Sequence, residues 1–113
     1  MIPTVTVSAY KNPEYSTTPG NATQDQVFLL SITEANKYFN SDSASQCKPT
    51  DYAVASGVYV DIDNGNCWWG LRSPGIFQSI AACVFSVGGV YERGHDVYYV
   101  HAVRPALWID LNS

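Results

Sequence analysis

The stretch "WWGLRSPG", Trp68–Gly75, is the best starting point for predicting the fold. It joins two large rings, Trp68 and Trp69, to Ser73-Pro74-Gly75, a tripeptide typical of a turn. Large rings just before a turn indicate a strand that supplies side chains to a core. We therefore predict a strand over Cys67–Leu71, with both tryptophans filling the core.

A second block of the same character, "AVRPALWIDL", lies at Ala102–Leu111. An arginine next to a turn or a proline commonly braces the backbone by donating to carbonyl oxygens. We assign that role to Arg72 and to Arg104. The predicted framework of the domain comprises Trp68, Trp69, Arg72, Pro74, Arg104 and Trp108.

The composition favours one globular domain with a neutral surface. The 113 residues suffice for a single core, and 46% of them are hydrophobic. Only 14% are charged, while 13% are aromatic. The net charge of −4 and the lack of a Lys/Arg cluster make nucleic acid an unlikely partner class. No apolar run has the length of a membrane span, and the N-terminus has no signal-peptide pattern.

The N-terminal part reads as two strands, a loop and a helix. Alternation of Val and Thr predicts a strand over Ile2–Tyr10, and the apolar run Gln26–Leu30 predicts another. Lys11–Asp25, between them, is rich in turn-forming residues and is predicted to be a loop. Ser31 followed by Glu34 is a capping box, so a helix is expected to begin there. Its apolar face would consist of Ile32, Ala35, Tyr38 and Phe39.

The following segments predict further short strands. The polar run Asn40–Tyr52 is expected to end the helix, and Ala53–Ile62 to form a strand. Asn64-Gly65 is typical of a type I′ hairpin turn, and its glycine falls one place early for a calcium loop. Strands are also predicted over Ile80–Val87 and Val97–Val103. One helix with six or seven short strands gives an α+β class, mostly antiparallel.

The cysteines leave two alternatives open. Cys47, Cys67 and Cys83 are odd in number and none lies at C-x-x-C spacing, so a zinc site or a thioredoxin-like motif has little support. One alternative is that all three are buried or half-buried thiols acting as small apolar residues. The other is a disulfide between Cys47 and Cys67.

The framework blocks carry a family resemblance. "CKPTDYAVASG", "GNCWWGLRSPG", "AVRPALWI" and the stretch Asn12–Phe39 resemble an uncharacterised bacterial and phage domain family, related to the formylglycine-generating-enzyme group. The resemblance covers about Ile2 to Leu111 and implies a C-type-lectin-like fold. Family members carry a further upstream stretch, so residues 1–113 resemble the C-terminal part of a longer family domain. That stretch would be supplied by a partner such as an upstream domain, be supplied by a second copy, or not be needed.

The segment between the two blocks, about residues 76–101, resembles the variable region of the target proteins of diversity-generating retroelements. In those systems adenine-directed errors turn Asn codons into codons for Tyr, His, Asp, Ser, Ile, Phe, Val, Cys, Arg or Gly. The resemblance implies that the segment is a hypervariable ligand-binding face. The implied variable positions are Ile76, Phe77, Ser79, Ile80, Cys83, Phe85, Ser86, Tyr91, Arg93, His95, Asp96, Tyr98, Tyr99 and His101.

The physical chemistry of these residues agrees with a contact surface. Tyrosine offers a large amphipathic area at little entropic cost, and exposed aromatics in this number would form a patch typical of a binding site. The alternative is that the rings point inward as core. We expect a non-enzymatic recognition domain without cofactor or metal, displayed on a cell surface or virion through a parent protein or partner. Its ligand would be a protein or glycan on another cell or particle.

Three other functions remain as alternatives. The histidines His95 and His101, with Asp96 beside the first, suggest acid–base or metal chemistry. The two histidines are six residues apart, however, and no third partner for them lies at a typical spacing. An enzyme of the formylglycine-generating type needs a cysteine pair near the C-terminus, and Cys83 has no second cysteine nearby. The last alternative is a structural surface module without a diversified site.

Overall fold

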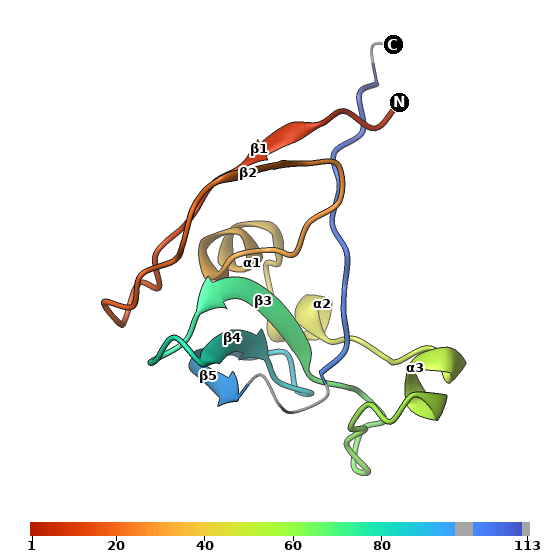
Figure 1. Cartoon of the computed structure of the whole chain (residues 1–113). Coiled ribbons are helices and arrows are strands. Elements are labelled where there is room, and N and C mark those ends of the chain that lie inside the picture. Colours follow the sequence, from red (N-terminus) through yellow and green to blue (C-terminus); the bar gives the residue numbers. More distant parts are fainter. Residues whose placement is uncertain (97–100, 112–113) are drawn as a thin grey trace.

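The computed structural model describes residues 1–96 and 101–111 and shows a small α+β domain (Figure 1). Within these residues there are two antiparallel sheets and three short helices. The first sheet pairs β1 (Val5–Val7) with β2 (Thr23–Asp25), and the second has the order β3 (Trp69–Pro74), β4 (Ile80–Val84), β5 (Val90–Asp96). The helices are α1 (Ile32–Tyr38), α2 (Asp42–Ser45) and α3 (Asp51–Ala55).

The core lies between α1 and the three-stranded sheet. The predicted capping box is confirmed: the Ser31 hydroxyl accepts from Glu34 N at 3.1 Å, and the Glu34 carboxylate accepts from Ser31 N at 3.0 Å. The helix places Ile32 and Ala35 against the sheet, where both are buried. The residues buried together in this core are Ile32, Ala35, Trp69, Leu71, Ala82 and Val84.

The strand register separates the two faces of this sheet. Trp69 pairs with Val84, so both side chains point to the α1 face. Gly70 pairs with Cys83, which in turn pairs with Tyr91, and Ala81 pairs with His95. These residues therefore lie on the opposite face. Register shifts between Gly70 and Pro74, and between Ala81 and Cys83, bend the strands locally.

The segment 101–111 runs beside this sheet and reaches the N-terminus. The segment after His101 passes Trp69 and Phe28, making a parallel bridge at Ala102 and an antiparallel bridge at Ala106. Asp110 N then donates to Met1 O at 3.0 Å. The N-terminus and the last described residues of the chain consequently lie near each other (Figure 1).

Several predicted elements in the N-terminal part require correction. The strand Ile2–Tyr10 shortens to β1, and β2 lies at the end of the predicted loop Lys11–Asp25. The predicted strand Gln26–Leu30 is wrong: its ordered pairing is a single bridge at Phe28, and the carbonyls of its last two residues accept from Arg72. Carbonyls that already accept from the side chain and backbone of another strand are not available to pair with a further strand.

The middle of the chain also differs from the prediction. The predicted strand Ala53–Ile62 is wrong, because α3 begins at Asp51 behind Thr50, whose hydroxyl accepts from Ala53 N at 3.1 Å. Ser41 caps α2 in the same way, at 3.2 Å from Ala44 N. Of the predicted loop Asn40–Tyr52, α2 occupies an inner part and α3 begins at its end. The capping residues Ser41 and Thr50 indicate these helices, although the polar composition of the segment is that of a loop.

Two predicted turns differ from those in the structure. Asn64 does not have positive φ, whereas Gly65 has φ of 74°, so Asn64-Gly65 is not a type I′ turn. Ser73 and Pro74 belong to β3, and the turn follows at residues 76–79. The strand predicted over Ile80–Val87 ends at Val84, and β5 precedes the predicted strand Val97–Val103, of which residues 97–100 lie outside the described part of the chain.

Candidate functional site

Five rings gather on the sheet face that points away from α1. This aromatic cluster consists of Trp68, Phe85, Tyr91, His95 and His101. The Trp68 and Phe85 ring centroids are 4.6 Å apart and edge-on, and Phe85 stacks on Tyr91 at 4.6 Å. His95 lies 5.1 Å from Trp68 and 5.4 Å from His101, which lies 5.8 Å from Trp68. All five are half-buried, so each retains some accessible surface.

The predicted variable positions divide by exposure. Phe77, Ser79 and Arg93 are exposed. The half-buried positions are Ile76, Ile80, Phe85, Tyr91, His95 and His101. Tyr98 and Tyr99 lie outside the described residues, as does the side chain of Asp96.

Two of the predicted variable positions are buried and require correction. Cys83 is fully buried in the middle strand, between Gly70 and Tyr91 in the register. Ser86 is buried because it docks another segment: its hydroxyl donates to Asp61 at 2.6 Å and its carbonyl accepts from Asn66 Nδ2 at 2.9 Å. The hydrogen bond from the Ser86 hydroxyl also lowers the pKa of Asp61. Neither side chain forms part of an exposed face.

Trp68 also changes its assignment. It was predicted to fill the core with Trp69, but alternation along the strand sends the two rings to opposite faces. Trp69 is fully buried against α1, whereas Trp68 is half-buried in the aromatic cluster. Trp68 therefore belongs to the candidate site and Trp69 to the framework.

His101 makes the cluster sensitive to pH. Burial lowers the pKa of His101, and the neighbouring His95 lowers it further. His101 is therefore neutral at pH 7, and a neutral imidazole suits an amphipathic contact surface.

Folding stability is expected to fall as the pH drops below about 6.5, the ordinary value for histidine. In that range the unfolded chain takes up a proton at His101 that the folded chain resists, so the unfolded state gains stability. Urea unfolding at pH 7.5 and at pH 5.5 would measure this. His101→Gln should reduce the difference between the two pH values, and an equal difference in both proteins would contradict it. Carboxylates such as Glu34 titrate at lower pH and do not confuse this window.

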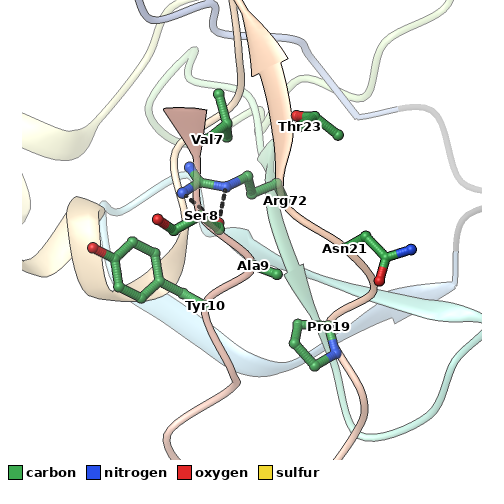
Figure 2. A pocket seen from close by; sticks show the side chains of 8 residues that line it. All are labelled: Val7, Ser8, Ala9, Tyr10, Pro19, Asn21, Thr23 and Arg72. Carbon is green, nitrogen blue, oxygen red and sulfur yellow. Dashed lines mark hydrogen bonds between the residues drawn. The ribbon is translucent and has the colours of Figure 1, made fainter. Parts of the chain in front are cut away.

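Arg72 ties three segments together and borders a cavity of about 260 Å³ (Figure 2). Its Nε and Nη2 donate to Ser8 O at 3.2 and 3.0 Å, and its Nη1 donates to Leu29 O at 2.7 Å and to the Glu34 carboxylate. Burial would raise the pKa of Glu34, but the Arg72 and Ser31 bonds lower it overall. Arg72 thus bonds carbonyls, the role expected of it, and its charge is matched by Glu34.

The other framework residues are placed as follows. Arg104 lies over the rings of Phe39 and Trp69, at 4.8 and 5.0 Å, and donates to Ser45 O at 3.3 Å. Pro74 ends β3, and its carbonyl accepts from Asn12. Trp108 is about half exposed, with its ring edge-on to Tyr38 at 6.1 Å. Tyr38 is correspondingly exposed rather than part of the core.

One important residue was missed within the predicted loop. Asn12 is buried and donates from Nδ2 to Pro74 O at 2.9 Å and to Glu92 O at 2.6 Å. Its Oδ1 accepts from Glu14 N at 2.8 Å. Asn12 therefore joins the N-terminal segment to β3 and β5, next to the open sheet face. The Asn-Pro dipeptide, a turn signal, was the only sequence indication.

Catalytic chemistry has little geometric support in the described part of the chain. Burial raises the pKa of Cys83 to about 12, so its thiol is protonated at neutral pH and a poor nucleophile. No group of three metal-ligating side chains is found among the described residues. None of the helices described is long and apolar enough to cross a membrane.

A family model described as a domain of unknown function, DUF6273, matches residues 1–111. No curated protein and no solved structure matches the chain significantly.

Proposed function

The chain belongs to the DUF6273 family, a domain of unknown function, and we propose that it is a non-enzymatic recognition domain. The aromatic cluster on the open face of the β3–β4–β5 sheet would be its binding face. We further propose that the α+β arrangement is a C-type-lectin-like scaffold and that residues 76–101 are its diversified segment. The ligand would be a protein or glycan on another cell or particle.

The observation that carries this proposal is the association of five partly exposed rings on one sheet face. Centroid separations of 4.6 to 5.8 Å make the face continuous, since aromatic pairs interact over this range. Rings of this kind dominate binding energy where they are held rigidly. Phe77 and Arg93, both exposed at predicted variable positions, extend the range of contacts that the segment offers.

The chemistry of the face favours a neutral ligand surface. Trp68, Phe85 and Tyr91 are uncharged, and the lowered pKa of His101 keeps its imidazole neutral at pH 7. A net charge of −4 disfavours phosphate backbones. Peptide and sugar surfaces, which offer apolar patches beside hydroxyl and amide groups, fit such a face better. Display at a cell surface or on a virion would bring it to them.

The genetic test is to sequence the DNA that flanks the gene. A near-copy of the stretch encoding residues 70–102, with mismatches confined to adenines in the copy and a reverse-transcriptase gene beside it, is the expected result. Absence of both elements from the complete flanking sequence would refute diversification of this segment.

The binding test uses Phe85→Ala combined with Tyr91→Ala, probed with a glycan array and a displayed library of cell-surface proteins. Losing two stacked rings from a binding face is expected to weaken the strongest wild-type hit by about 100-fold, a hot-spot effect. Tyr52→Ala combined with Tyr59→Ala is the matched control, because these tyrosines are exposed elsewhere. Equal weakening by both pairs, or by neither, would contradict the proposal. Circular dichroism would verify that both variants fold.

A further inference from the structure

Two of the three cysteines face each other at the base of a long excursion of the chain. Cys47 follows α2, and Cys67 immediately precedes the aromatic cluster residue Trp68. They are partners in an isolated antiparallel bridge, in which Cys67 N donates to Cys47 O at 2.9 Å. Cys67 Sγ also lies 3.2 Å from Cys47 O. Both thiols are free in the structure.

The backbone geometry of this pair suits a disulfide. Directly opposite residues in antiparallel pairs have Cα atoms about 4.5–5.5 Å apart. Disulfides join residues whose Cα atoms are about 4.4–6.8 Å apart, so the bond requires little backbone movement. The two thiols also interact electrostatically. The pKa of Cys67 is raised to about 11, mainly by burial and in second place by the nearby Cys47 thiol.

We propose that Cys47 and Cys67 form a reversible disulfide that locks the base of the excursion 48–66. A small-molecule disulfide such as oxidised glutathione would be the oxidant. The half-buried Cys47, as thiolate, attacks one sulfur of the oxidant and expels a thiolate, leaving a mixed disulfide. Cys67 then loses its proton to solvent, its thiolate attacks the Cys47 sulfur, and the second small thiolate leaves. Two protein thiols are oxidised, and one disulfide is reduced to two thiols.

The locked segment is one that few other contacts hold. None of the residues of α3 is buried. In the segment 48–66, all of which the structure describes, Val58 is the single buried hydrophobic residue. Beyond it, Asp61, Asn64 and Asn66 dock on Ser86. Because Trp68 follows Cys67 directly, bracing this point also braces one edge of the aromatic cluster. Reduction of the disulfide would remove this constraint on the edge of the aromatic cluster.

The test treats the full chain with oxidised glutathione and follows free thiols, intact mass and thermal unfolding. The expected product has lost two thiols and carries no glutathione, and peptide mapping places the bond between Cys47 and Cys67. Closing a loop of about 20 residues is expected to raise Tm by about 10 °C. Dithiothreitol should reverse the shift. The closing step should accelerate as the pH rises, because the attacking species is the Cys67 thiolate and burial raises the pKa of this thiol.

Two variants keep the result decisive. Cys83→Ala should behave like the wild type, since Cys83 lies on β4, away from the bridge. Cys47→Ser should lose no thiol and gain no Tm. A stable glutathione adduct on Cys47, a bond to Cys83, an intermolecular disulfide or no oxidation at all would each overturn the proposal.

Discussion

Replacing Trp69 with alanine is expected to destabilise the protein by about 4 kcal/mol, the usual cost of truncating a fully buried tryptophan. Trp69 has no exposed surface and lies at the centre of the core formed by α1 and the sheet. Alanine would leave a cavity that the surrounding strands cannot fill. It would also remove an edge contact with Phe39 at 5.8 Å and the Arg104 contact at 5.0 Å.

The substitution also breaks a buried hydrogen bond. Trp69 Nε1 donates to Ser45 O at 2.9 Å, which ties β3 to the end of α2. Without it Ser45 O retains the longer bond from Arg104 at 3.3 Å. A buried acceptor left poorly satisfied costs further stability, about 1–3 kcal/mol where no water replaces the donor.

The matched control is the neighbouring tryptophan. Trp68→Ala removes a ring of the same size from the open face, where it is half-buried. Its cost is expected to be less than half that of Trp69→Ala, because solvent refills the space. Urea unfolding followed by circular dichroism measures both, and Trp69→Phe tests whether retained volume restores part of the loss. Equal costs for the two alanine variants would show that the faces have been assigned wrongly.

This pair illustrates what the sequence allowed us to predict. The α+β class, the α1 start at Ser31 and the buried strand containing Trp69 followed from a capping box and a run of large side chains. The same run could not say which tryptophan points inward, since that depends on the strand register. Register in turn is set by pairing with Val84, far along the chain.

The errors have a common physical origin. Ala53–Ile62 is rich in residues that favour strands, yet Thr50 caps a helix just before it, and Gly57, with φ of 96°, follows that helix. Strand propensity is weak where no partner strand is available, and a local cap then decides. Asn12 and Ser86 were misjudged for the converse reason: their roles depend on partners distant in sequence.

The candidate site was predictable in part for the same reason. Aromatic and imidazole residues between the framework blocks were visible in the sequence, and the structure brings Phe85, Tyr91, His95 and His101 together. The bulge between Ala81 and Cys83 could not be foreseen, although it determines which β4 side chains share the open face.

A second large effect is expected at the turn between β4 and β5, where Gly88→Ala should destabilise the protein by about 3 kcal/mol or more. Gly88 has φ of 96°, a conformation that side chains with a Cβ rarely adopt. An added Cβ would lie 1.8 Å from Asp42 O and 2.9 Å from Ser45 Oγ. The first clash is with backbone, so α2 would have to move.

Movement of α2 would spread the damage beyond the turn. The Gly88 carbonyl accepts from Ser45 Oγ at 2.6 Å, and Ser45 O accepts from Trp69 Nε1. A displaced α2 therefore weakens the contacts on the core tryptophan as well. For this reason the cost should exceed the 1–2 kcal/mol typical of left-handed backbone alone.

The adjacent glycine provides the control. Gly89 does not have positive φ, and an added Cβ would meet Phe85 Cδ2 at 3.8 Å, an ordinary contact. Gly89→Ala should therefore change the free energy of unfolding by less than about 1 kcal/mol. Thermal and urea unfolding of the two variants would compare neighbours of identical chemistry. If Gly88→Ala were as harmless as Gly89→Ala, the close approach of this turn to α2 would be refuted.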